Sequence, residues 1–263
     1  MNILDKILED KKNELILKKK ILPINYLKKS PIFNRECISL KKSLTKSASG
    51  IIAEHKRRSP SKNNINNSLS LINVIKGYEN AGACGISVLT NTKFFGGSIE
   101  DLILARETTN LPILRKEFII DEYQITESKA NGADAILLIA SILNNKEIKH
   151  LSNFAKNLGL EILIEVHNLE EIEKSILPNI DLIGINNRNL KTFDVNIERS
   201  KKLAKMIPEK YLKISESGIE KTTSILELKS YGFSGFLIGE KFMKTNDPGK
   251  ATSEFIKKIE NET

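Results

Sequence analysis

Eight short apolar runs recur along this chain at nearly even intervals, and each is followed by a stretch with helical periodicity. On average about 26 residues separate successive runs, which is close to the length of one strand, one crossover helix and two loops. Runs such as LIGI and FLIG are apolar on both faces, as the strands of a buried parallel sheet are. The predicted strands are Gly50–Glu54, Gly85–Leu89, Pro112–Lys116, Ala135–Ala140, Glu161–Val166, Leu182–Asn186, Leu212–Glu216 and Gly235–Gly239.

The segments between and after these strands predict helices, and two of them carry clear terminal signals. Asp121 precedes EYQITESKA at the position of a helix N-cap, and Gly159 follows FAKNL as a C-terminal stop. The predicted helices are Leu69–Asn80, Ile99–Thr108, Asp121–Asn131, Asn144–Leu158, Leu169–Leu177, Ile197–Met206, Ile219–Tyr231 and Pro248–Glu260.

Eight successive βα units close most economically into a barrel. The predicted fold class is therefore α/β, a (β/α)8 TIM barrel with an extra N-terminal helical segment. A doubly wound open sheet is the alternative, because periodicity does not show whether the sheet edges meet. We predict a single barrel domain over residues 1–263, with 1–49 as the N-terminal helical extension. The apolar positions that share one helical face in this extension are Ile3, Leu4, Ile7, Leu8 and Leu15.

Composition excludes several classes of protein. Apolar residues make up 40% and charged residues 28% of the chain, which is typical of soluble globular domains rather than disordered or fibrous ones. Cys37 and Cys84 cannot form a disulfide framework, and three scattered histidines give no metal-ligand spacing. The sequence has neither a signal peptide nor a run of 18 apolar residues, so we expect a cytoplasmic protein that does not associate with a membrane.

The net charge of +8, from 41 Lys and Arg against 33 Asp and Glu, is dispersed along the predicted helices. Nucleic-acid binding would favour a basic cluster with aromatic residues between the charges, and the chain has no Trp and no basic tail. We therefore expect no nucleic-acid partner. The excess positive charge suits an anionic small-molecule substrate equally well.

Polar side chains end five of the predicted strands or follow them closely. In a βα barrel these strand ends share one face, so the side chains should converge there on a substrate. Any one of them could instead belong to a solvent-facing loop. Together, three carboxylates and two lysines in one mouth would perturb each other's pKa values and so supply a general acid and a general base. The residues are Glu54, Lys56, Lys116, Glu165, Asn186, Glu216 and Ser217.

Two glycine-containing turns follow the last two strands. Gly218 stands between the strand end at Glu216 and the next helix, and Gly239 precedes Glu240 in the same way. Backbone N–H groups in such turns can bind an anion, and phosphate sites after strands 7 and 8 are frequent in barrels of this kind. The same glycines could simply permit tight turns. A phosphorylated substrate is the functional interpretation.

Seven segments, in order along nearly the whole chain, resemble those of the indole-3-glycerol phosphate synthase family, and the N-terminal ILDKILEDKK resembles its additional helix before the barrel. The resemblance implies ring closure of 1-(2-carboxyphenylamino)-1-deoxyribulose 5-phosphate to indole-3-glycerol phosphate in tryptophan synthesis, with loss of carbon dioxide and water. It also implies no metal and no organic cofactor. The segments are AEHKRRSPSK (53–62), VLTNTKFFGGS (88–98), LRKEFIIDEYQI (114–125), EILIEVHN (161–168), IGINNRNLKTF (183–193), ISESGI (214–219) and FLIGEKFMK (236–244).

The resemblance also implies roles for the residues that end the strands. Lys116 would be the general acid at the ketone oxygen, and Glu165 the general base for the proton lost when aromaticity is restored. Lys56 would hold the departing carboxylate. Which of the two lysines serves the dehydration step stays open. The residues that would orient these groups and complete the rim are Glu54, Asn186, Glu216 and Ser217.

The remaining residues carried over from the resemblance would bind the substrate. Phosphate would lie against a guanidinium and the glycine turns, with a serine nearby, and two aromatic side chains would form the walls for the anthranilate ring. These residues are Arg188, Gly218, Gly239, Glu240, Ser59, Phe95 and Phe118. We expect a monomer that acts on a small phosphorylated molecule.

Two departures from the family's usual pattern concern loops. Asn63-Asn64 stands where the family often has glycine, and Asn189 where it often has aspartate. Both positions bear on loop behaviour rather than on proton transfer. A different phosphate-binding barrel, such as a sugar-phosphate isomerase, is the competing interpretation, because it would reuse the glycine turns without needing two lysines around an aromatic slot.

Overall fold

Eight parallel strands form a closed barrel in the computed structural model, which describes residues 2–189 and 192–262. Leu190 and Lys191, within the segment 183–193 that resembles the family, lie outside the described residues. Because β1 pairs with both β2 and β8, the sheet has no free edge, and the predicted barrel is confirmed over the open sheet. The strands are β1 (Ile51–His55), β2 (Gly85–Leu89), β3 (Ile113–Lys116), β4 (Ala135–Ile139), β5 (Glu161–Val166), β6 (Leu182–Asn186), β7 (Leu212–Glu216) and β8 (Phe233–Ile238).

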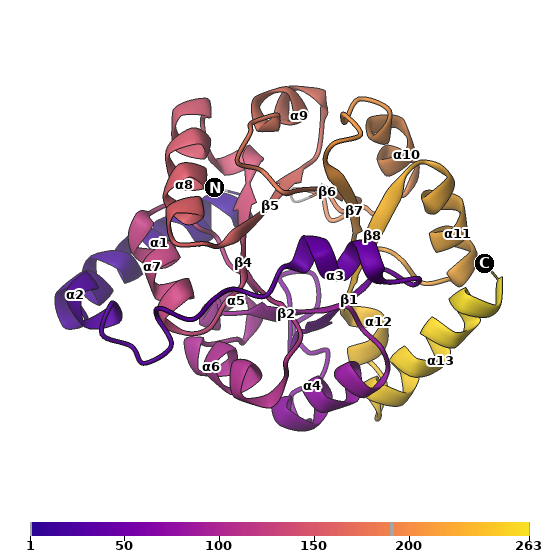
Figure 1. Cartoon of the computed structure of the whole chain (residues 1–263), viewed down its shortest axis with the longest axis horizontal. Coiled ribbons are helices and arrows are strands. Elements are labelled where there is room, and N and C mark those ends of the chain that lie inside the picture. Colours follow the sequence, from indigo (N-terminus) through magenta and orange to yellow (C-terminus); the bar gives the residue numbers. More distant parts are fainter. Residues whose placement is uncertain (1, 190–191, 263) are drawn as a thin grey trace.

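Helices surround the barrel in alternation with the strands (Figure 1). The predicted helix signals hold: Asp121 caps its helix by accepting a hydrogen bond from the backbone N–H of Tyr123 at 2.9 Å, and Gly159 has a φ of 75° just after its helix ends. These helices are α4 (Leu71–Asn80), α6 (Ile99–Thr108), α7 (Glu122–Ala130), α8 (Asn145–Asn157), α9 (Leu169–Ser175), α10 (Glu198–Ala204), α11 (Thr222–Ser230) and α13 (Pro248–Glu262).

Side chains alternate between the barrel interior and the surrounding helices, as the period of a strand requires. On β1, Ile51 and Ala53 pack in the outer layer against the helices, whereas Ile52 packs inside the barrel. Leu114, Leu163 and Ile214 fill the same interior layer from β3, β5 and β7. The interior is a packed core, so a substrate can only be held above it, at one end.

The N-terminal extension covers both ends of the barrel. Its helices are α1 (Ile3–Ile21), α2 (Ile24–Leu27) and α3 (Leu40–Lys46), of which only the first was predicted. Figure 1 shows α3 lying across the near end of the barrel, where its Leu40 and Leu44 pack beside Gly85 and Gly235 at the starts of β2 and β8. Ile7 of α1 belongs to the interior cluster instead and lines the cavity at the other end.

Several short elements differ from the sequence prediction. The helix predicted from Ile219 begins at Thr222, because its N-cap residue Lys221 still has extended backbone angles, with φ −122° and ψ 146°. The last strand begins at Phe233 rather than Gly235. Two further helices that the sequence did not predict, α5 (Thr92–Phe95) and α12 (Glu240–Met243), and the 3-10 turn η1 (Ala140–Ile142) follow strand ends.

Across residues 2–189 and 192–262, every helix is too short or too polar to cross a lipid bilayer.

Candidate active site

A cavity of about 390 Å³ opens at the carboxyl ends of the strands, a volume within the usual range for a small-molecule site. The structure brings every site residue predicted from the sequence to its lining. These are Glu54, Lys56, Ser59, Phe95, Lys116, Phe118, Glu165, Asn186, Arg188, Glu216, Ser217, Gly218, Gly239 and Glu240.

The strand period explains why the charged side chains point into this cavity. On β1, β3, β5 and β7 the residue two positions before the charged one packs in the barrel interior. The charged residue that follows shares its face and lies one layer higher, at the mouth. The four residues placed in this way are Glu54, Lys116, Glu165 and Glu216.

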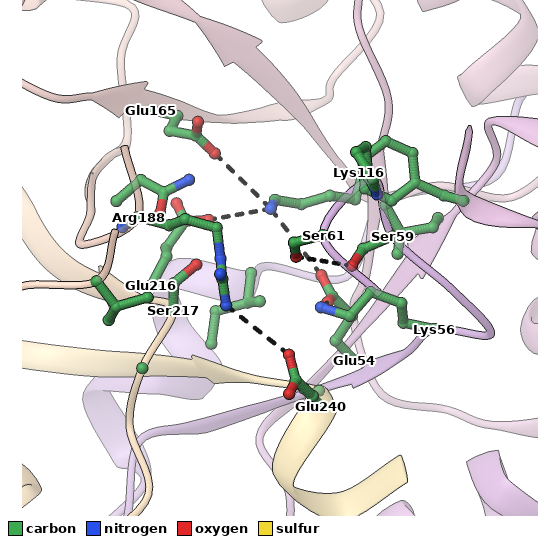
Figure 2. Close-up of a pocket in the computed structure, with 18 of the residues that line it drawn as sticks. Glu54, Lys56, Ser59, Ser61, Lys116, Glu165, Arg188, Glu216, Ser217 and Glu240 are labelled. Carbon is green, nitrogen blue, oxygen red and sulfur yellow. Dashed lines mark hydrogen bonds and ion pairs between the residues drawn. The ribbon is translucent and has the colours of Figure 1, made fainter. Parts of the chain in front are cut away.

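The Lys116 ammonium lies among three carboxylates, one from each of the other three strands (Figure 2). Its Nζ is 3.1 Å from Glu216 Oε2, 3.7 Å from Glu165 Oε2 and 3.9 Å from Glu54 Oε2. The lysine side chain is 15% exposed, whereas the three carboxylates are almost fully buried. Lys116 is therefore the group of this cluster that is best placed to meet a molecule in the cavity.

Lys56 is joined to Lys116 through a shared carboxylate. Its Nζ lies 2.7 Å from Glu54 Oε1, while Lys116 approaches the other oxygen of Glu54. Ser87 Oγ also donates a hydrogen bond to Glu54 Oε2 at 3.3 Å. The two ammonium groups thus contact different oxygens of one carboxylate, that of Glu54.

Burial and charge act in opposite directions on these carboxyls. For Glu54, burial alone would raise the pKa, but Lys56 and Lys116 hold that pKa below its ordinary value. For Glu216, burial and the neighbouring Glu165 outweigh Lys116 and raise the pKa to about 7. For Lys116, burial disfavours the charge, yet the surrounding carboxylates raise its pKa and keep it protonated. Acid and base functions near neutral pH are therefore available in one cluster.

Two glycines leave the space that these carboxylates occupy. A Cβ on Gly184 of β6 would collide with Glu216 Oε1, and a Cβ on Gly239 would lie 2.7 Å from Glu54 Oε1. Any larger residue at either position would have to displace a buried charge. The predicted anion-binding turn at Gly239 thus has a second role, which is to make room for Glu54.

Apolar side chains line the same cavity as the charged cluster. The rings of Phe95 and Phe118 lie with centroids 6.0 Å apart at an interplanar angle of 37°. Sequence reasoning predicted this aromatic pair but missed the contribution of α1, whose Ile3, Leu4 and Ile7 also line the cavity. The apolar face recognised on this helix was the available signal, although nothing in the sequence showed which end of the barrel it covers.

Another part of the cavity rim is basic, because Lys62, Arg188 and Lys244 gather around Glu240. Arg188 donates from Nη1 to the carbonyl of Phe193 at 3.2 Å, and its Nη2 lies 3.8 Å from Glu240 Oε2 (Figure 2). Lys62 and Lys244 contact Glu240 Oε1 at 2.6 and 2.9 Å. Burial would raise the pKa of Glu240, but these two lysines lower it to about 2. Glu240 therefore stays ionised, and Lys62 and Lys244 offset its charge.

Ser217 holds an unusual backbone conformation at this rim. Its φ of 68° lies in the left-handed region that few residues other than glycine adopt, and Gly218 follows with a φ of 75°. Asn187 Nδ2 donates to the Ser217 carbonyl at 3.0 Å and fixes the turn. Such a strained residue at a cavity is typical of functional sites.

No group of three or more His, Cys, Asp and Glu side chains arranged to hold a metal ion is found among the described residues.

Comparisons with known proteins identify the family of this chain. The family model described as indole-3-glycerol phosphate synthase matches residues 4–255. A protein of that name from Bacteroides thetaiotaomicron is 45% identical over 98% of this chain and 99% of its own length. Its namesakes from Campylobacter jejuni and Caldanaerobacter subterraneus are 44% and 45% identical, over 97% and 98% of this chain and 100% and 98% of their own lengths.

Among solved structures, thiamine phosphate pyrophosphorylase from Pyrococcus furiosus resembles the fold with a TM-score of 0.62. It is 18% identical and covers 85% of this chain and 98% of its own, so it supports the barrel architecture alone. The match over residues 4–255 and the identities of 44–45% over nearly whole chains show the family directly: this chain belongs to the indole-3-glycerol phosphate synthase family.

Proposed function

We propose that this cavity converts 1-(2-carboxyphenylamino)-1-deoxyribulose 5-phosphate to indole-3-glycerol phosphate, with release of carbon dioxide and water, as a step of tryptophan synthesis. The observation that carries the proposal is the Lys116 ammonium, which lies within 3.9 Å of three buried carboxylates in a cavity that Phe95 and Phe118 also line. Membership of the family supports the same reaction.

Lys116 acts as the general acid. Attack of the aromatic ring on the ketone carbon places negative charge on the ketone oxygen, and an ammonium within hydrogen-bond reach stabilises that charge and supplies the proton. Against the effect of burial, the carboxylates of Glu216, Glu54 and Glu165 raise the pKa of Lys116 and keep the lysine charged until substrate arrives. The hydroxyl formed in this way later leaves as water, and that step also needs a proton donor.

Glu165 acts as the general base. Its Oε2 lies 3.7 Å from Lys116 Nζ, so acid and base can reach neighbouring atoms of one substrate. Once carbon dioxide has left, the dehydration that restores the aromatic indole requires the loss of a proton, and the Glu165 carboxylate accepts it.

Lys56 holds the carboxylate that departs as carbon dioxide, and Glu54 fixes this lysine through the 2.7 Å ion pair. Because both lysines contact Glu54, both are candidates for the dehydration step. Asn186 accepts a hydrogen bond from the backbone N–H of Arg188 at 2.9 Å, which joins the catalytic cluster to the basic rim. Asn186, Glu216 and Ser217 orient the substrate hydroxyls.

The phosphate binds at the basic rim. Arg188 and the backbone N–H groups around Gly218, Gly239 and Glu240 supply charge and donors, and Ser59 lies in the same lining. Phe95 and Phe118, which line the same cavity, bind the anthranilate ring. The substrate therefore spans the cavity, with its reacting carbons over Lys116.

We also propose that the protein works as a monomer in the cytoplasm on this small phosphorylated substrate, without a nucleic-acid partner. The dispersed distribution of its +8 net charge supports the last point. Light scattering after size-exclusion chromatography tests the monomer, and a second copy per particle would contradict it.

The direct test is turnover of purified protein with 1-(2-carboxyphenylamino)-1-deoxyribulose 5-phosphate, followed by indole fluorescence and by release of carbon dioxide. We expect both signals to rise together and in equal amounts. Folded protein that produces neither signal from verified substrate would contradict the proposal and favour another phosphate-binding barrel activity.

A further inference from the structure

His167 lies directly behind the proposed general base and outside the cavity lining. It follows β5, two residues after Glu165, and its side chain is 11% exposed. Its Nε2 is 3.6 Å from Glu165 Oε1, and its Nδ1 is 3.3 Å from Glu171 Oε2. The imidazole thus stands between a carboxylate of the active site and a carboxylate of α9.

Glu171 is held in place independently of the imidazole. Its Oε2 accepts a hydrogen bond from the backbone N–H of His167 at 2.8 Å, and its Oε1 accepts one from Asn168 Nδ2 at 2.9 Å. Asn168 is itself the N-cap of α9, because its Oδ1 accepts from the backbone N–H of Glu171 at 2.9 Å. The start of this helix therefore presents a fixed anion to His167 Nδ1.

The contact that Nδ1 makes with Glu171 determines what the other ring nitrogen, Nε2, presents to Glu165. A carboxylate beside Nδ1 places a proton on that nitrogen, so Nε2 faces Glu165 either as a lone pair or as a second N–H. His167 Nε2 is buried and has no hydrogen-bond partner within the described residues. A buried polar nitrogen without a partner calls for an explanation. The carboxylate of Glu165 lies 3.6 Å from this nitrogen.

We propose that His167 is a positioning residue that holds the carboxylate of Glu165 in place and aims it at the substrate. Its imidazolium pairs with Oε1 of Glu165, while Lys116 attracts Oε2 at 3.7 Å. The carboxylate is thereby fixed at both oxygens and remains a base. The assignment rests on the proposed function of Glu165, whereas the contacts among His167, Glu165 and Glu171 do not depend on it.

The carboxylates around the His167 ring favour its protonated form, the imidazolium. Burial alone would lower the pKa of His167, but Glu171, Glu165 and the more distant Glu216 raise it above its ordinary value. These three carboxylates come from α9, β5 and β7. Two lysines lie beyond these carboxylates: Lys116 is on the far oxygen of Glu165, and Lys174 of α9 acts on Glu171.

The first test is the pH profile of kcat/KM for His167→Asn. An imidazolium beside a carboxylate favours the charged form of that carboxylate, so its removal should move the acidic limb to higher pH by about half a unit to one unit. At alkaline pH, where the wild-type imidazole is neutral, the two profiles should converge. His150→Asn is the matched control, since His150 is exposed and pairs with Glu122 on the surface, and it should leave the profile unchanged. An unshifted limb, or an equal loss of rate at every pH, would overturn the proposal.

The second test does not depend on turnover. A proton NMR titration of the His167 ring in wild type, Glu165→Gln and Glu171→Gln should give a lower midpoint in each variant than in wild type. A midpoint unaffected by Glu165→Gln would refute the pairing itself. If instead the midpoint falls but the protein forms no indole, the proposed function fails while the His167–Glu165 interaction stands.

Discussion

Lys116 Nζ lies 3.1 Å from Glu216 Oε2 at the mouth of the barrel, and Gly184 leaves the space into which that carboxylate fits. Glu216 is nevertheless the carboxyl of this cluster whose pKa is raised, to about 7, because burial and Glu165 outweigh the lysine. The charge of the rim therefore changes close to neutral pH, and the stability of the fold should change with it.

Glu216→Gln should remove one part of the pH dependence of stability. Between the ordinary value of 4.5 and about 7, folded protein holds a proton on Glu216 that the unfolded chain has lost. This group's contribution to stability is thus fully present below pH 4.5 and is lost as pH rises through 7. The free energy of unfolding of wild type relative to the variant should fall by up to about 3 kcal/mol over this window. Urea denaturation at several pH values measures this difference.

The exposed Glu209 provides a control for that experiment. Glu209→Gln should give a difference from wild type that stays flat across the same window. A flat difference for Glu216→Gln as well would show that this carboxyl titrates normally in the folded protein.

Lys56→Met should impair catalysis more than binding of the phosphate. The change removes the 2.7 Å ion pair between Lys56 and Glu54. Of the two lysines that contact this buried carboxylate, Lys116 alone is then left. We expect kcat/KM to fall by at least about tenfold, because positioning of the departing carboxylate and proton donation both suffer. Steady-state kinetics by indole fluorescence measure this, with the exposed Lys76→Met as the control. Kinetics equal to those of the control would remove Lys56 from the mechanism.

Lys11→Ala should loosen α1 from the barrel. Lys11 is 2% exposed and its Nζ lies 3.2 Å from Glu117 Oε2, so the change leaves a buried carboxylate without this cation. We expect a loss of stability of about 3 kcal/mol. KM should rise too, because Ile3, Leu4 and Ile7 of this helix line the cavity.

Chemical denaturation and substrate titration of the Lys11 variant check both effects. The exposed Lys12→Ala, one position along the same helix, should change neither quantity. Unaltered KM in a clearly destabilised Lys11 variant would mean that α1 supports the fold without shaping the site.

The barrel and most of its site follow from the sequence because both depend on periods. Strands of fixed length with alternating faces place Glu54, Lys116, Glu165 and Glu216 on one layer, and this could be read from the ends of the apolar runs. Ser59, Phe95, Phe118 and Arg188 came from the resemblance alone, since loops carry no such period.

The path of the N-terminal extension could not be predicted for a physical reason. α2 and α3 are too short to show a helical period, and Lys11 is a buried lysine whose burial depends on a partner, Glu117, from a distant strand end. His167 was also missed, although a signal existed. Asn168 followed three residues later by Glu171 is the pattern of a helix N-terminus. This pattern places the Glu171 carboxylate beside His167, the residue before the N-cap.

The central claim is that the Lys116 ammonium supplies the proton for ring closure, and single-turnover kinetics of Lys116→Ala test it most directly. With enzyme in excess, product release does not limit the signal, so the rate of indole formation reports the chemical steps. We expect a loss of at least about a hundredfold, with the circular dichroism spectrum of the barrel retained. The exposed Lys202→Ala should react at the wild-type rate. A Lys116→Ala protein that forms indole at close to that rate would contradict the account.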